Sequence, residues 1–187
     1  MRILAISGSL RADSYNSRLL RIAAEEAPAG ADFDIYDGLA TIPPYDADHD
    51  IGDGPEPVRE LRELIVNSDG LVFSTPEYNS SIPGVLKNAI DWASRPRATT
   101  PLAGKPAGVM GATTGQFGAV WAQAELRKVL GSTGSRVVDA EVSLALAHDA
   151  FSDDGSLADH ITRQQVRDLV EAVVSEIDRD RELTLAA

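Results

Sequence analysis

The segment "FSTPEYNSSIPGVLKNAIDW", Phe73 to Trp92, joins the end of an apolar strand to an amphipathic helix through a polar loop. Pro76 and Pro83 bracket this loop, and each proline fixes one backbone φ angle. The loop is therefore stiffer than its length suggests, and it can hold its main-chain N–H and C=O groups in fixed directions. Tyr78 adds an aromatic face, and Asn79 adds both a donor and acceptors. We interpret the segment as one border of a flat polar ring, although a tyrosine at the edge of the core is an equally simple explanation of Tyr78 alone.

Strand-like and helix-like segments alternate along the 187 residues. Apolar or alternating runs predict strands, and apolar residues at helical spacing predict helices. The predicted strands are 2–7, 32–36, 70–75, 106–111 and 136–142, and the predicted helices are 16–27, 57–66, 85–92, 119–130 and 161–177. Residues 37–55 are rich in Pro and Gly and are expected to form a long loop. No linker divides the chain, so we expect one domain over 1–187, with a frayed tail over about 180–187.

Near-continuous apolar strands between helices indicate a parallel sheet covered by helices on both faces. In such a sheet, ligands bind outside the carboxyl ends of the strands. The first, third and fourth strands are followed by "SGSLRADSYN", "STPEYNSS" and "GATTGQFG". These three polar or glycine-rich loops lie far apart in the sequence but are expected to meet at one edge of the sheet.

Composition excludes several classes of function. The chain has no cysteine, which excludes disulfides, thiolate metal sites and cysteine nucleophiles and fits a cytoplasmic protein. Its formal charge of -12 disfavours nucleic acid as a partner. No apolar run approaches the roughly 20 residues that a membrane helix needs, so no membrane insertion is expected. Binding an anionic cofactor would therefore require local cations, and Arg11, Arg18 and Lys87 lie near the polar loops.

The loop after the first strand has the composition of a phosphate site. Ser9, Ser14 and Asn16 offer hydroxyl and amide donors, and Arg11 offers a charge-assisted contact. The following helix adds unpaired N–H groups and the positive end of its dipole. Ser14 or Asn16 alone would be explained as a helix cap. Because an ordinary cap needs only one such residue, we predict that this loop binds a phosphate.

The sequence predicts no metal site. The three histidines, His49, His148 and His160, lack the spacing of metal ligands. The acidic run at 46–50 is better explained as a solvated loop, and "SDDG" at 152–155 as a turn, because neither has the further ligands of a calcium loop. No Ser/His/Asp arrangement stands out either.

Two motifs together, "GSLRADSYN" and "PEYNSSIPGVLKNAIDW", resemble the NADPH-dependent FMN reductase family, a flavodoxin-like group of quinone, azo-dye and chromate reductases. The resemblance covers most of the chain and extends to "PLAGKPAGVMGATTGQFG" and "FSDDGSL". It departs from the commonest pattern at Ser80, where glycine is frequent, and at Thr113-Thr114, where Ser-Pro is frequent. These differences bear on substrate preference more than on cofactor binding.

The resemblance implies a flavodoxin-like, doubly wound, five-stranded parallel sheet that binds FMN non-covalently and uses NADPH or NADH as co-substrate. It implies that the phosphate is held by Ser9, Arg11, Ser14 and Asn16. It also implies that the ring is bordered by Pro76, Glu77, Tyr78 and Asn79 and completed by Thr113, Thr114 and Gly115. The implied assembly is a homodimer or homotetramer with the flavin near a subunit boundary.

The expected activity is transfer of electrons from a nicotinamide to quinones or similar small acceptors by a ping-pong mechanism. The lack of a catalytic side-chain constellation agrees with this, because the flavin itself carries the chemistry. An alternative is a flavodoxin-like electron carrier reduced by a partner reductase, which shares the fold and suits the acidic charge. A phosphatase-like domain is a third possibility, but the small tyrosine-phosphatase type needs a cysteine in the first loop.

Overall fold

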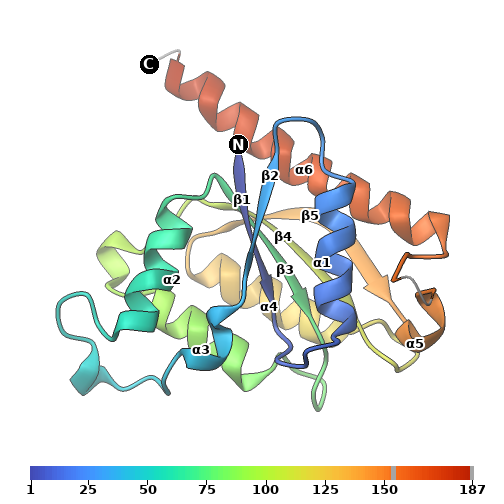
Figure 1. The fold of residues 1–187 in the computed structure, drawn as a ribbon. Coiled ribbons are helices and arrows are strands. Elements are labelled where there is room, and N and C mark those ends of the chain that lie inside the picture. The colour runs from blue at the N-terminus through green and yellow to red at the C-terminus, as the bar shows by residue number, and fades with distance from the viewer. Residues whose placement is uncertain (153–154, 186–187) are drawn as a thin grey trace.

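The computed structural model describes residues 1–152 and 155–185. In this part of the chain, five parallel strands form one sheet in the order β2-β1-β3-β4-β5 (Figure 1). The strands are β1 (Arg2–Ser7), β2 (Asp32–Tyr36), β3 (Gly70–Thr75), β4 (Pro106–Ala112) and β5 (Arg136–Leu144). The sheet confirms the doubly wound, flavodoxin-like, five-stranded fold that the resemblance implied.

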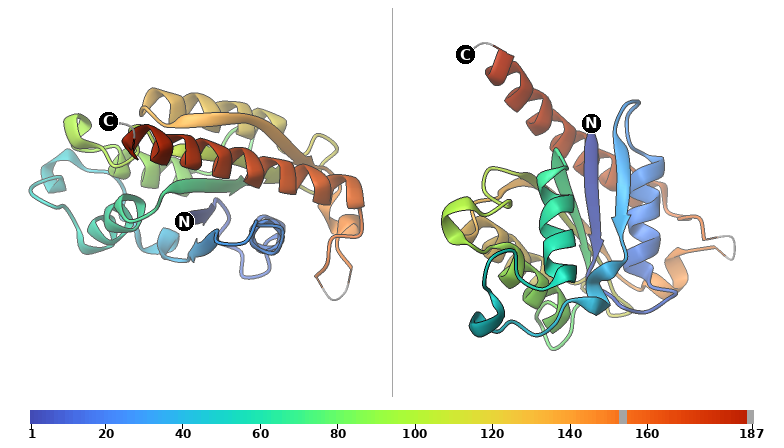
Figure 2. Two further views of the ribbon diagram at one scale, coloured as in Figure 1. Left: turned by 90° about the horizontal axis from the view of Figure 1, so that it is seen from above. Right: turned by 60° about the vertical axis from the view of Figure 1, so that its left-hand side comes forward.

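Helices cover both faces of the sheet (Figure 2). One face carries α1 (Tyr15–Glu25) and α6 (His160–Leu185), and the other carries α2 (Glu56–Val66), α3 (Gly84–Ala93) and α4 (Val120–Ser132). None of the described helices is both long and apolar enough to cross a membrane.

The alternation of side chains along β1 shows why both faces are covered. Leu4 and Ile6 are buried against the layer that contains α2, α3 and α4, whereas Ile3 and Ala5 are buried against α1 and α6. Successive residues of a strand point to opposite faces, so a strand that is apolar throughout needs a layer on each side. The continuous apolar pattern of the sequence therefore predicted this arrangement correctly.

The structure has short helical segments that were not predicted, and its last helix ends later than predicted. Helix α6 continues to Leu185, well beyond the predicted end at 177, and its last turns extend past the amino end of β1 (Figure 1). The predicted loop at 37–55 contains two short 3-10 helices, Gly38–Thr41 and Ala47–His49, and another, Arg97–Thr99, follows α3. The short helix α5 (Ala147–Ala150) was not predicted, because four residues are too few to show a helical period. The turn predicted at 152–155 includes 153–154, which lie outside the described residues, as do 186–187 of the predicted tail.

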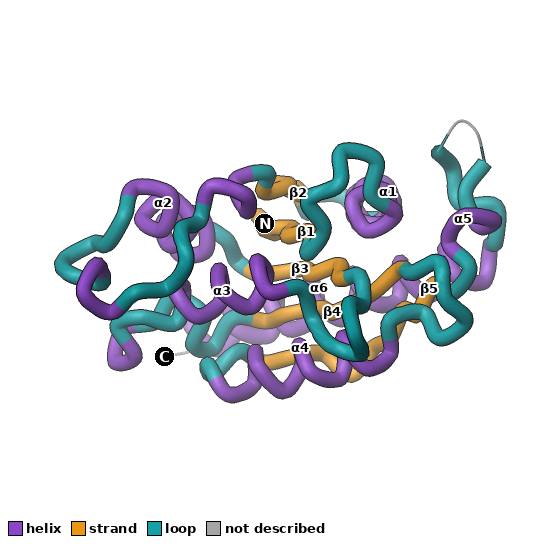
Figure 3. Tube along the Cα trace, turned by 90° about the horizontal axis from the view of Figure 1, so that it is seen from below, coloured by secondary structure: helices purple, strands orange, loops and turns teal. Residues whose placement is uncertain are grey.

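The order of the strands places a switch point between β1 and β3. The chain leaves β1 toward α1 on one face and leaves β3 toward α3 on the other, so the loops after these strands diverge at the carboxyl edge. Figure 3 views the molecule from below, onto this edge, where the loops after β1, β3 and β4 lie side by side. Ligands of doubly wound sheets bind in the crevice that such a divergence creates.

Candidate functional site

The loop after β1 is held by a chain of hydroxyl groups. Ser17 Oγ donates to Ser7 Oγ at 3.1 Å, and Ser7 Oγ accepts from the N–H of Ser9 at 3.3 Å. Gly8 donates its N–H to the carbonyl of Ser74 in β3 at 2.8 Å. A Cβ on Gly8 would lie 3.0 Å from Leu86 and 3.2 Å from the Thr75 hydroxyl, so a side chain there would push this loop away from the loop after β3.

Helix α1 begins at the end of this loop with Ser14 as its N-cap. The Ser14 hydroxyl accepts from the N–H of Asn16 at 3.2 Å. Ser14 therefore caps α1, as the simpler explanation of this residue predicted. Ser9 and Arg11 lie in the loop that leads to this capped end of the helix. Ser9 is half-buried and Arg11 is exposed, with its guanidinium bonded to the Asp13 carbonyl at 2.8 Å.

Arg18 forms an ion pair with Asp13, which lies just before the start of α1. Its Nε and Nη2 both donate to Asp13 Oδ1, at 3.0 and 2.6 Å, and these hydrogen bonds hold the pKa of Asp13 below its usual range. Arg18 also lies 5.8 Å from the Tyr15 ring centre and 5.7 Å from that of Phe151. Because Arg18 offsets the charge of Asp13, the Arg11 guanidinium can act as the attractive charge for an anion here.

The loop after β3 is a tight hairpin. Tyr78 and Ser81 exchange both main-chain hydrogen bonds, at 3.0 and 3.1 Å, and the two residues between them have positive φ, 52° at Asn79 and 60° at Ser80. This is the pattern of a type I′ turn. Pro76 is buried at the base of the hairpin, whereas Tyr78 and Asn79 are exposed. The stiffness predicted from the two prolines is thus accompanied by a defined turn.

Two carboxylates tie this hairpin to α4. Glu77 accepts from the N–H groups of Trp121 and Ala122, both at 3.1 Å, at the first turn of α4. In the opposite direction, Ser81 Oγ donates to Glu125 of α4 at 2.5 Å. The hairpin is therefore fixed relative to α4 at both of its ends.

The loop after β4 is anchored to the segment that follows β5. Thr113 donates its N–H to the Leu144 carbonyl at 3.0 Å, and its own carbonyl accepts from the N–H of Ala147 at 3.0 Å. Gly115 donates its N–H to the Thr113 hydroxyl at 3.3 Å. Thr113 is half-buried, whereas Thr114 and Gly115 are exposed at the edge. These residues lie at the same edge of the sheet as the hairpin.

Three exposed aromatic side chains lie in the hairpin, in the loop after β4 and in the first turn of α4, and we call Tyr78, Phe117 and Trp121 the aromatic rim. Their exposed fractions are 53%, 60% and 48%. Phe117 and Trp121 contact each other edge to face, with ring centres 5.0 Å apart. Because the Glu77 carboxylate accepts from the main-chain N–H of Trp121, Tyr78, the next residue in the hairpin, lies near the start of α4.

The carboxyl edge brings all eleven predicted site residues together, since each lies in one of the three loops or in the first turn of α1. Asn16 differs from the others because its side chain is buried and bonded to Ser74 and Ala112 rather than facing the loop. Lys87 was expected to add positive charge near the site. Its ammonium instead pairs with Asp91 at 2.7 Å, one turn along α3.

Ser7, Ser17 and Ser74 were missed by the sequence reasoning. A serine inside the otherwise apolar strand "GLVFST" was a detectable signal, because a buried hydroxyl needs a partner.

The donors of the loop after β1 suit a phosphate. Ser9, Arg11, Ser14 and the first turn of α1 lie within one short segment and supply hydroxyl, cationic and N–H donors, which is the chemistry of a phosphate site at a helix N-terminus. No group of three or more His, Cys, Asp or Glu residues in the described chain could hold a metal ion.

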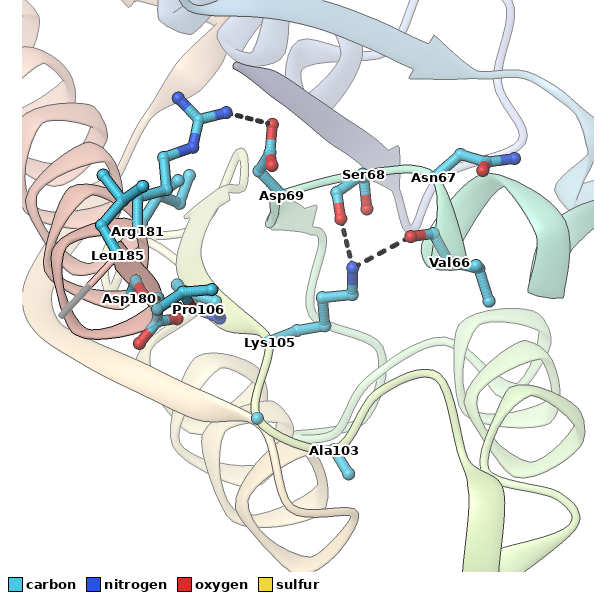
Figure 4. Close-up of a pocket in the computed structure, with 13 residues that line it drawn as sticks. Val66, Asn67, Ser68, Asp69, Ala103, Lys105, Pro106, Asp180, Arg181 and Leu185 are labelled. Atoms are coloured by element: carbon cyan, nitrogen blue, oxygen red, sulfur yellow. Dashed lines mark hydrogen bonds and ion pairs between the residues drawn. The ribbon is translucent and has the colours of Figure 1, made fainter. Parts of the chain in front are cut away.

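A hollow of about 650 Å³ lies at the opposite edge of the sheet (Figure 4). Lys105 projects into it and donates to the carbonyls of Val66, at 3.2 Å, and Ser68, and burial lowers the pKa of this lysine. Arg181 and Asp69 form an ion pair of 3.1 Å across the same hollow. The lysine thus satisfies carbonyls at the end of α2, which gives it a structural role far from the three loops.

Comparison with known proteins shows which family the chain resembles. The model of the NADPH-dependent FMN reductase family matches residues 1–149. An NAD(P)H-dependent FMN reductase of Pseudomonas aeruginosa is 41% identical over 174 residues, covering 92% of this chain and 93% of the relative. A quinone reductase of Escherichia coli is 42% identical over 131 residues, covering 70% of this chain and 69% of the relative.

A solved structure supports the same grouping. FerB, a flavoenzyme NAD(P)H:(acceptor) oxidoreductase from Paracoccus denitrificans, superposes with a TM-score of 0.83 at 35% identity, covering 95% of this chain and 97% of FerB. The similarity therefore extends over nearly the full length of both chains.

Proposed function

Because the chain belongs to the NADPH-dependent FMN reductase family, we propose that it binds FMN non-covalently and transfers electrons from NADPH or NADH to quinones or similar small acceptors. The observation that carries this proposal is the convergence of three polar loops at the switch point between β1 and β3, one with phosphate donors and two with ring-facing groups. A bound FMN supplies a ring that accepts a hydride and passes electrons on.

The residues of the three loops have separate tasks in this proposal. Ser9, Arg11 and Ser14, with the first turn of α1 in which Asn16 lies, hold the phosphate. The rigid segment Pro76, Glu77, Tyr78 and Asn79 presents fixed main-chain groups to one edge of the ring, and Thr113, Thr114 and Gly115 complete its surround. With FMN bound, N–H groups of these loops would stabilise negative charge on the ring, because the protein holds them in fixed orientations.

One open side of the crevice serves both substrates. A nicotinamide donor and an oxidising acceptor use this side in turn, which predicts ping-pong kinetics. The loops shield the remaining surface and orient the substrates. A flavodoxin-like carrier, in contrast, would need a separate reductase.

The proposal also covers the oligomeric state, the domain organisation and the cellular compartment. We place a second copy of the chain against the aromatic rim, to give a homodimer or a homotetramer, because exposed aromatic clusters are typical of protein interfaces. Residues 1–187 act as one domain, and the protein works in the cytoplasm, which cell fractionation can check.

The test uses the purified protein alone. We expect a yellow protein that releases FMN on heating, identified by chromatography, and that loses its yellow absorbance when NADPH or NADH is added without oxygen or any partner. Release of FAD, or no bound flavin even after reconstitution with FMN, would contradict the proposal. Loss of colour only when a separate reductase is added would favour the carrier.

A further inference from the structure

The Asn16 side chain makes several hydrogen bonds to other parts of the protein, which a residue that only binds a cofactor would not require. Its side chain is 3% exposed, at the first turn of α1. Asn16 Oδ1 accepts from the Ala112 N–H at 3.0 Å and from Ser74 Oγ at 2.9 Å, while Nδ2 donates to the Ala112 carbonyl at 2.9 Å. The amide thus pairs with both main-chain groups of one residue and with a buried hydroxyl of another.

These partners lie at the starting points of the ring-facing loops. Ser74 is one residue before the end of β3, which leads into the hairpin at 76–81. Ala112 is the last residue of β4, which leads into the loop at 113–118. Asn16 itself follows the phosphate loop. One side chain is therefore bonded at the junction of all three loops of the site.

Turning Asn16 toward a phosphate would break these contacts. The Ala112 N–H and C=O and the Ser74 hydroxyl would be left without their partner inside the protein, and buried polar groups without partners are costly. Ser9 and Arg11, in contrast, are accessible without such a loss. The neighbouring donors can hold the phosphate while Asn16 keeps its place.

We propose that Asn16 is a positioning residue that fixes the two ring-facing loops relative to the phosphate loop, rather than a ligand of the phosphate. The proposal rests on the FMN-dependent function proposed above. It predicts that Asn16 affects binding of the ring itself, and not only binding of the phosphate.

Comparing FMN with riboflavin separates these roles, because riboflavin has the same ring and lacks the phosphate. Asn16→Ala is expected to weaken binding of both flavins by a similar factor, about tenfold or more, and to shift the midpoint potential of bound flavin. Arg11→Ala is expected to weaken FMN binding roughly 10- to 100-fold and to leave riboflavin binding unchanged.

Asn88→Ala is the matched control. The Asn88 side chain also bridges main-chain groups, since Nδ2 donates to the Pro43 carbonyl at 2.8 Å and Oδ1 accepts from the Tyr45 N–H at 2.8 Å. These partners lie in the segment after β2, outside the three loops. This variant is expected to lower stability while leaving flavin affinity and potential at the parent values.

The outcomes are distinct. Loss of FMN affinity alone in Asn16→Ala would make Asn16 a phosphate ligand and overturn the proposal, as would unchanged affinity for both flavins. If Asn16→Ala does not fold, Ser74→Ala removes one of the three bonds and is expected to weaken both flavins in parallel to a smaller degree; an unchanged Ser74→Ala then overturns the proposal. Failure of the parent protein to bind either flavin would instead contradict the proposed function.

Discussion

At the scale of single residues, Ser80 shows a conformation that its side chain disfavours. It has φ of 60° at the second central position of the hairpin, after Asn79 at 52°. Asparagine visits this left-handed region more readily than other residues, whereas serine pays roughly 1–2 kcal/mol for it. Type I′ turns accordingly favour Asn-Gly. The departure from glycine at Ser80 is therefore a structural cost of this chain.

Ser80→Gly is expected to raise the free energy of unfolding by roughly 0.5–1 kcal/mol. Relief of the left-handed strain exceeds the extra entropy that glycine gives to the unfolded chain. Urea denaturation measures the change. Ser94→Gly is the control, since Ser94 has φ of -75° and gains nothing from glycine, so this variant should lose stability. Equal effects of the two substitutions would show that the turn is not strained.

At the scale of elements, α4 lacks a cap of its own. Its N-cap residue is Ala119, which has φ of 62° and no side-chain acceptor. Glu77 replaces the missing cap from another loop by accepting from Trp121 and Ala122, and its carboxylate lies at the positive end of the helix dipole. The residue expected to border the ring thus also fixes a helix to the hairpin.

Glu77→Ala is expected to lower the free energy of unfolding of the flavin-free protein by about 1 kcal/mol, the usual cost of removing a helix cap. Glu77→Gln keeps an acceptor oxygen but loses the charge, so a smaller loss is expected. Chemical denaturation of the apoprotein measures both, which separates the cap from any effect on cofactor binding. Parent-like stability of Glu77→Ala would show that α4 does not depend on this contact.

At the scale of the whole molecule, the sequence predicted the sheet and the edge at which the three polar loops meet, because both depend on local patterns. Apolar strands such as β3 and the polar residues that follow them are visible within a few positions. The partners of Asn16 and Glu77 are not visible in this way, since Ala112 is 96 residues from Asn16 and Ala122 is 45 residues from Glu77. The sequence therefore indicated which residues gather at the site but not which of them bond to the protein itself.

Under our proposal, the aromatic rim forms the contact between copies of the chain in the oligomer. Trp121→Glu puts a charge on a side chain that is 48% exposed and packed against Phe117, and burying an unpaired charge in an interface is strongly unfavourable. Light scattering after size-exclusion chromatography should give the parent a multiple of the 19.9 kDa chain mass and Trp121→Glu the mass of one chain. Ile51→Glu, at an apolar residue that is 78% exposed outside the rim, should keep the parent mass. A parent protein that is monomeric at micromolar concentration, or a Trp121→Glu variant that keeps the parent mass, would exclude the rim as the contact between copies.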